Sequence, residues 1–305
     1  MKSPLYCIYH SADCDGYSSA AIVKYRYPEA ILVGYNYGES IPEIPEGSEV
    51  IMVDVSLPMD EMHKLSQKCK DKKFTWIDHH ISAITDYTNL KSDFGLSDFC
   101  QGSLEVGKAA CELTWNYFFP DNKMPLSIAL LGDYDVWRNT DKAKWNDLIM
   151  PFQLGIRLIC NSAETFPEEL LHTNMVDGPS VECRALTNTI LEHGQVILAY
   201  QKKNDERAAK SSFVAEFKGL RALCLNIGGA NSTVFDSKYN PEEHDIMMIF
   251  AYNGKCWKAT LYSAKEEVNC SIFAKELGGG GHHGAAGFQT DDIFKLLKSE
   301  DLYKK

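Results

Sequence analysis

The sequence contains no apolar run approaching the roughly 18 residues that a membrane-spanning helix requires. It also lacks a hydrophobic signal core near its N-terminus. None of its 10 cysteines forms a Cys-x-x-Cys pair, and several lie within apolar segments, so we interpret them as buried, reduced thiols. These absences predict a cytoplasmic protein with no membrane partner.

The sequence also has no excess of basic over acidic residues. The 31 lysines and arginines are outnumbered by 42 acidic residues, which leaves a net charge of -11. Proteins that bind long nucleic acids by releasing counterions are usually basic, so we expect no long duplex partner. A short anionic substrate, held by metal ions, is still compatible with this charge.

Apolar residues make up 45% of the chain, which is ordinary for a protein with a full hydrophobic core. In the first half, short apolar runs alternate with segments of helical spacing, a pattern typical of a doubly wound, mostly parallel α/β sheet. We predict strands at residues 5–9, 31–35, 50–53 and 74–77, and helices at residues 17–27, 58–70 and 104–119. Residues 126–131 are ambiguous between a buried strand and a helix.

The second half begins after a break at Asp177-Gly178-Pro179. A long polar helix with an apolar stripe is expected from about residue 180 to residue 210. Further strands are predicted at residues 213–217, 222–226, 246–252 and 257–262, and a helix at residues 271–277. Asn253-Gly254 is a strong hairpin signal between the last two strands. We therefore expect domains at residues 1–180 and 211–305, the second smaller and also α/β, joined by a helical connector at residues 181–210.

Acidic and imidazole side chains follow three predicted strands and the apolar segment at residues 129–132. They are His10, Asp13, Asp15, Asp54, Asp78, His79, His80, Asp133 and Asp135. A single aspartate at a helix start is more often a cap than a ligand. In an open parallel sheet, however, ligands bind beyond the carboxyl ends of the strands, so repetition at four such positions favours a site. Of the last two acids we select Asp133 as the ligand and set Asp135 aside.

Histidine and carboxylate ligands without a thiolate suit Mn²⁺ best, with Mg²⁺ or Co²⁺ as alternatives. Two cations about 3.5–4 Å apart would activate a water molecule and hold phosphoryl oxygens. Asp54 is the candidate bridge between them, His79 adds a nitrogen ligand and Asp133 another oxygen. The helix that opens at Gly16 favours an anion such as a phosphate.

These residues resemble the four motifs of the DHH phosphoesterase superfamily: the His10 to Gly16 loop, Asp54, Asp78-His79-His80 and Gly132-Asp133. The segment 278–287, with its glycines and His282, resembles the signature of the DHHA1 C-terminal domain. The resemblance covers essentially the whole chain. In length the chain resembles the compact nanoRNase and pAp-phosphatase branch.

The resemblance implies a role for each residue. One cation would be held by His10, Asp13 and Asp54, and the other by Asp15, Asp54, His79 and Asp133. Asp78 would orient His79, and His80 would face the scissile phosphate, so both Asp78 and His80 would be catalytic. A substrate phosphate would be bound in the second domain by Gly279, Gly280, Gly281 and His282.

The function implied is a Mn²⁺-dependent phosphodiesterase that uses a metal-activated hydroxide to cleave short oligonucleotides or linear dinucleotides to 5′-mononucleotides. Alternatives are a pAp phosphatase, a cyclic-dinucleotide phosphodiesterase, an exopolyphosphatase or pyrophosphatase, and a non-catalytic nucleotide-binding regulator. A homodimer is left open. Relatives often carry Arg-Ser where this chain has Tyr262-Ser263, so Tyr262, Arg221 or Arg157 would have to replace the phosphate-binding arginine.

Overall fold

A computed structural model describes residues 3–94, 99–174, 178–281 and 283–298. The chain divides into two compact units, Met1–Leu198 and Ala199–Lys305. The division falls inside a long helix, α8 (Val181–Ala209), within the segment predicted to be the connector. None of the helices in the described ranges has the length and apolar content needed to cross a membrane.

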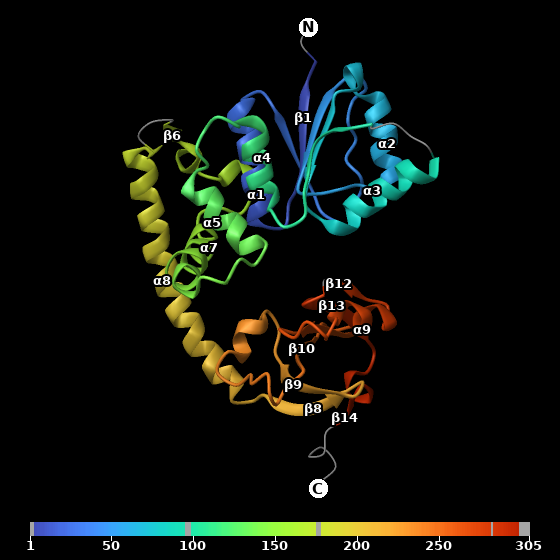
Figure 1. The fold of residues 1–305 in the computed structure, drawn as a ribbon, viewed down its shortest axis with the longest axis vertical. Coiled ribbons are helices and arrows are strands. Elements are labelled where there is room, and N and C mark those ends of the chain that lie inside the picture. Colours follow the sequence, from blue (N-terminus) through green and yellow to red (C-terminus); the bar gives the residue numbers. More distant parts are fainter. Residues whose placement is uncertain (1–2, 95–98, 175–177, 282, 299–305) are drawn as a thin grey trace. The chain divides into compact units, whose positions relative to one another are not determined.

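The first unit is built on a parallel five-stranded sheet of order β2-β1-β3-β4-β5. Its strands are β1 (Leu5–His10), β2 (Ile31–Tyr35), β3 (Glu49–Val53), β4 (Phe74–Asp78) and β5 (Gln101–Leu104). In Figure 1, α1 (Cys14–Arg26) and α4 (Ala110–Phe118) cover one face of this sheet, and α2 (Met59–Lys68) and α3 (Ile81–Phe94) cover the other. The predicted doubly wound α/β fold is thereby confirmed.

Alternation along the strands explains why both faces are covered. Cys7 and Tyr9 of β1 pack in the core shared with α1 and α4, whereas Ile8 between them packs toward α2 and α3. Successive side chains of a strand point to opposite faces, so a strand that is apolar throughout needs a helical layer on each side. This arrangement leaves the carboxyl ends of β1, β3 and β4 side by side at one edge of the sheet.

The rest of the first unit is helical. It contains α5 (Leu126–Asp135), α6 (Lys142–Lys144), a π-helical turn (Trp145–Ile149), α7 (Met150–Ile156) and the start of α8, together with short turns. Their apolar side chains form a core with α1 and α4, to which Ile22, Trp115, Leu130, Phe152 and Ile190 belong. A two-stranded ribbon pairs β6 (Thr173–Asn174) with β7 (Gly178–Pro179).

The structure resolves one ambiguous segment of this unit and corrects one prediction. Residues 126–131, which the sequence leaves ambiguous between a strand and a helix, belong to α5, which begins after Pro125 and continues to Asp135. The sequence also predicts a helix from residue 104, but β5 ends at Leu104 and α4 begins only at Ala110. Short apolar runs cannot be assigned to a strand or a helix by periodicity alone.

The second unit contains a seven-stranded sheet of order β12-β13-β11-β10-β9-β8-β14. Its elements are β8 (Phe213–Phe217), β9 (Leu220–Asn226), β10 (Ile246–Tyr252), β11 (Trp257–Tyr262), α9 (Cys270–Glu276), β12 (Gly280–Gly281), β13 (Ala285–Thr290) and β14 (Leu297–Lys298). The Asn253-Gly254 hairpin is present, with Tyr252 opposite Trp257 across an antiparallel pair. The strands after the glycine-rich segment were not predicted.

Candidate metal centre

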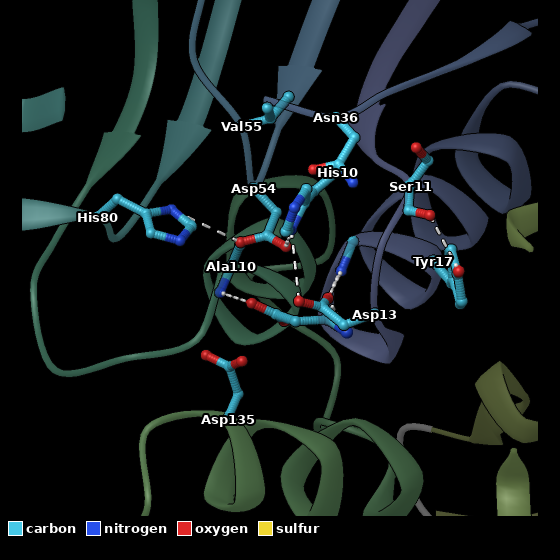
Figure 2. A network of polar contacts seen from close by, with 12 residues as sticks. His10, Ser11, Asp13, Tyr17, Asn36, Asp54, Val55, His80, Ala110 and Asp135 are labelled. Atoms are coloured by element: carbon cyan, nitrogen blue, oxygen red, sulfur yellow. Dashed lines mark hydrogen bonds and ion pairs between the residues drawn. The ribbon is translucent and has the colours of Figure 1, made fainter. Parts of the chain in front are cut away.

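The acidic and imidazole side chains converge at the carboxyl edge of the first sheet, as the sequence indicated. His10 ends β1, Asp54 follows β3 directly, and His79 and His80 follow β4. Asp13 caps α1, which starts beside the end of β1. Figure 2 shows His10, Asp13, Asp54 and His80 pointing toward a common centre.

Asp54 lies at the middle of this centre. It is 1% exposed, and its backbone adopts the left-handed conformation with φ 59°. Among the described residues, neither of its carboxylate oxygens has a hydrogen-bond partner. The imidazoles of His10 and His79 are 3.5 and 3.4 Å away, which exceeds the usual hydrogen-bond length of about 2.7–3.2 Å. A buried carboxylate with two unsatisfied oxygens is what a cation ligand requires.

A first group of potential ligands comprises His10, Asp13 and Asp54. The Oδ1 atom of Asp13 accepts the backbone N–H groups of Asp15 and Gly16, both at 3.1 Å, and caps the helix. Its Oδ2 atom lies 3.4 Å from His10 Nδ1. Burial alone would lower the pKa of His10, but its contacts with Asp13 and Asp54 raise that pKa to about 10. The imidazole thus occupies a place where the surrounding carboxylates favour positive charge.

A second group comprises Asp15, His79 and Asp135. The Nε2 atom of His79 is 3.6 Å from Asp15 Oδ2 and 3.4 Å from Asp135 Oδ2. Asp15 is oriented by the first turn of α4, where the backbone N–H groups of Ala110 and Cys111 donate to its two oxygens at 2.9 and 2.8 Å. Burial and the charges of Asp15 and Asp54 raise the pKa of Asp135 to about 9.

A third group comprises Asp54, His79 and His80, so the three groups overlap at Asp54 and at His79. Burial, followed by the charge of Asp15, raises the pKa of Asp54 well above its usual range. Carboxylates crowded in a buried space destabilise one another unless positive charge is added. Imidazole and carboxylate ligands in overlapping sets therefore fit a pair of divalent cations.

The structure corrects the choice between the two acids of α5. Asp133 belongs to none of the three groups; its oxygens bind Arg138 Nη1 at 2.7 Å and Lys144 Nζ at 2.5 Å. Asp135 instead points from α5 toward the cluster, as Figure 2 shows. In a strand, residues two apart share a face, but in a helix they lie about 200° apart around the axis. Asp135, which the sequence led us to set aside, is therefore the better placed candidate ligand.

Asp78 is completely buried and organises the turn after β4. Its Oδ1 atom accepts the backbone N–H groups of His79 and His80 at 2.7 and 3.0 Å, and lies 2.7 Å from Nδ1 of His80. The indole N–H of Trp76 donates to Oδ2 at 3.2 Å. The ring that Asp78 orients is thus that of His80, whereas we expected His79. Burial alone lowers the pKa of His80, but the contact with Asp78 raises it overall.

The predicted phosphate-binding glycines lie in the second unit. Gly280 and Gly281 form β12 and pair with Gly287 and Ala286 of β13. A Cβ atom at Gly279 would lie 2.1 Å from the carbonyl oxygen of Gly287, so close packing alone requires glycine there. His282 lies outside the described residues. The binding of a phosphate by this segment stays a prediction.

Sequence reasoning missed Tyr37, whose ring centroid lies 5.8 Å from that of His10. The signal available was its position two residues after β2, the strand beside β1.

Three residues were suggested as substitutes for the phosphate-binding arginine of relatives. Of these, Arg157 has its guanidinium 5.7 Å from the ring centroid of Tyr134. Ser263, next to Tyr262, donates its hydroxyl to the carbonyl of Asp245.

No family model matches the sequence. The chain is 26% identical to the uncharacterized protein R106 of Acanthamoeba polyphaga mimivirus, over 97% of this chain and 69% of that protein. Its fold is similar to the solved DHH domain of a protein described as a member of a family of ribosomal proteins, with a TM-score of 0.56 and 13% identity over 94% of this chain and 82% of that one. A pGpG-specific phosphodiesterase, PggH of Vibrio cholerae, has a TM-score of 0.48 and 11% identity over 95% of this chain and 94% of that one. The shared fold is shown by the first of these structures, the DHH domain.

Proposed function

We propose that this chain, which has the fold of a DHH domain, is a metal-dependent phosphohydrolase of the DHH superfamily. The observation that carries the proposal is Asp54, a buried carboxylate with two unsatisfied oxygens at the overlap of two ligand groups. A side chain in this state is costly for the fold unless a cation completes it. The shared DHH-domain fold provides independent support.

The proposed cations are two Mn²⁺ ions, with Mg²⁺ or Co²⁺ as alternatives. His10, Asp13 and Asp54 would hold one of them, and Asp15, His79 and Asp135, together with Asp54, would hold the other. When bound, such ions lower the pKa of water and neutralise charge on phosphoryl oxygens. Because Asp54 is buried and Asp15 is held by two backbone N–H groups, these ligands lose little conformational freedom on binding.

His80 would act on the substrate. Its Nδ1 atom is engaged by Asp78, so its Nε2 atom is available to donate a hydrogen bond to a phosphoryl oxygen. Asp78 raises the pKa of the ring and favours the protonated form that such a donor needs. Asp78 is therefore proposed to position His80 and keep it charged.

The substrate we propose is a short oligonucleotide or a linear dinucleotide, cleaved to 5′-mononucleotides. The net charge of -11 disfavours long polyanions, which require a broad basic surface. Two metal ions can coordinate the oxygens of the scissile phosphate directly, so a short substrate does not need such a surface. A homodimer stays a prediction.

The test is turnover of a substrate panel by the purified protein with Mn²⁺, Mg²⁺ or a chelator. The panel comprises a 5′-phosphorylated dinucleotide, a longer RNA, pAp, cyclic di-AMP and polyphosphate. Rapid Mn²⁺-dependent cleavage of the dinucleotide, abolished by Asp54→Ala, is the expected result. Turnover of polyphosphate alone would contradict the nucleotide substrate, and tight nucleotide binding without turnover would identify a regulator instead.

A further inference from the structure

Tyr37 stands at the rim of the proposed metal centre. It lies in the loop after β2, and its side chain is 51% exposed. Its ring centroid is 5.8 Å from that of His10 and 6.5 Å from that of His80. Among the exposed aromatic side chains of the described residues, it is the one whose ring contacts imidazoles of the cluster. An exposed aromatic surface therefore adjoins the place where a phosphate would bind.

Contacts on two sides hold this ring in place. The backbone N–H of Ser56, two residues after Asp54, donates to the Tyr37 hydroxyl at 3.3 Å. The backbone N–H of Tyr37 donates to the Asn36 side chain at 2.9 Å, and the ring of Tyr35 lies edge-on at a centroid distance of 6.4 Å. The side chain thus links the loops that follow β2 and β3. A ring fixed in this way loses little freedom when a ligand stacks on it.

The ring is also suited to a nucleotide ligand. A tyrosine side chain is a flat aromatic surface without a formal negative charge at neutral pH, so it does not repel phosphate. A flat, neutral aromatic surface binds any nucleobase through its π-face, without selecting a sequence. The ring cannot make a comparable stacking interaction with polyphosphate, which has no bases.

We infer that Tyr37 is a stacking platform for the nucleobase next to the scissile phosphate, and that it gives the site its preference for nucleotides over polyphosphate. A nucleobase is separated from its own phosphate by a single sugar, so the phosphate of a base stacked on Tyr37 would lie near the His10 and His80 imidazoles, whose ring centroids are 5.8 and 6.5 Å from that of Tyr37. This inference rests on the proposed phosphohydrolase function and specifies its substrate class. Tyr37 acts on binding and takes no part in the chemical step.

The first experiment pairs a change in the protein with a change in the substrate. Wild type, Tyr37→Leu and Tyr37→Phe are assayed on a 5′-phosphorylated dinucleotide and on the same compound with one base removed. Tyr117→Leu is the matched control, because Tyr117 is also exposed, at 37%, and lies in α4. Tyr37→Leu is expected to raise KM for the intact dinucleotide about 5- to 150-fold with little change in kcat, the range for loss of one base–aromatic stack.

The effects of Tyr37→Leu and of base removal on KM should not be additive. Removing the base should cost wild type and Tyr37→Phe that same factor, but should cost Tyr37→Leu almost nothing further. A tyrosine with only a structural role would lower activity on both substrates equally, and that result would overturn the inference. Polyphosphate turnover, where present, should be unchanged by Tyr37→Leu.

A binding measurement separates this inference from the proposed hydrolysis. A dinucleotide containing 2-aminopurine is titrated with each protein in Ca²⁺, because Mn²⁺ is itself a fluorescence quencher. Quenching that is present with wild type and Tyr117→Leu but lost with Tyr37→Leu supports stacking, even if no dinucleotide is hydrolysed. Equal quenching by all variants, or no binding by any of them, overturns the inference, even if the enzyme hydrolyses dinucleotides.

Discussion

Two aspartates of α5, Asp133 and Asp135, should respond to the same substitution with opposite signs in the metal-free protein. Asp135 has a pKa of about 9 in the folded protein, against an ordinary value of 3.8, because burial and the charges of Asp15 and Asp54 disfavour its ionised form. Because the pKa of Asp135 is higher in the folded state than in the unfolded state, the contribution of this carboxyl group to stability is fully present below about pH 4. It is lost as the pH rises toward 9.

The magnitude follows from this interval. Between pH 3.8 and pH 7 the unfolded chain releases the proton while the folded chain keeps it, which costs about 1.4 kcal/mol per pH unit. The metal-free fold is thus destabilised by on the order of 4 kcal/mol at pH 7. Asp135→Asn carries no such proton and should recover this free energy, which corresponds to a rise in Tm of about 10 °C for a unit of this size.

Asp133→Asn is the matched control, since it makes the same chemical change two residues away. Asp133 is 7% exposed and is paired with Arg138 and Lys144, which lose their common partner when its charge is removed. Because both cations are partly exposed, the expected loss is about 1–3 kcal/mol. The substitution should therefore lower Tm.

The assay is thermal unfolding of chelator-treated wild type and both variants at pH 4.5 and pH 7. The free energy of unfolding of Asp135→Asn should exceed that of wild type by only about 1 kcal/mol at the lower pH and by about 4 kcal/mol at the higher one. In saturating Mn²⁺ this advantage in stability should vanish, because Mn²⁺ stabilises wild type but binds more weakly to the variant, which has lost a carboxylate ligand. If both variants lowered Tm alike at pH 7 without metal, the assignment of Asp135 to a crowded anionic centre would be refuted.

Further predictions concern the metal ions and two supporting residues. Mn²⁺ at 100 times its Kd should stabilise wild type by about 2.7 kcal/mol for each ion bound in calorimetry, and the effect should be absent in Asp54→Ala; an unchanged shift would exclude Asp54 as a ligand. Trp76→Phe removes the indole donor to Asp78 and should cost about 1–3 kcal/mol in urea unfolding, together with a lower kcat. Gly16→Ala places a Cβ atom 1.9 Å from the carbonyl oxygen at the end of β1 and should yield no folded protein by circular dichroism. Gly228→Ala, whose nearest neighbour would be 3.7 Å away, should fold normally.

The parallel sheet and its ligand-bearing edge could be predicted because each depends on local signals. The runs before His10, Asp54 and Asp78 are short and mostly apolar, as in strands covered on both faces. Parallel strands bring their carboxyl ends to one edge, so the convergence of these side chains follows from the fold class. Neither inference needs side-chain geometry.

The features that could not be predicted depend on where particular side chains point in the folded protein. The run before Asp133 gave no sign of whether it was a strand or a helix, and that choice decides which of two aspartates reaches the centre. β5 was missed because it has only four residues, one of them a glycine with φ 141°. Tyr37 was missed because its role depends on a contact with His10, in a different loop.

The crowding at this centre links metal binding to folding. Asp54 combines a left-handed backbone, which is uncommon for a residue other than glycine, with a buried carboxylate whose oxygens have no hydrogen-bond partner among the described residues. Asp15 and Asp135 add carboxyl groups at the same place, so ionising all of them in the metal-free fold costs free energy in addition to the backbone strain. Divalent cations relieve the repulsion, and part of their binding free energy should appear as folding free energy. In the presence of metal, a variant of any of these three carboxylates should therefore bind the cations more weakly and lose part of the stabilisation that they give. Metal affinity should increase with pH, because cation binding requires the ionised forms.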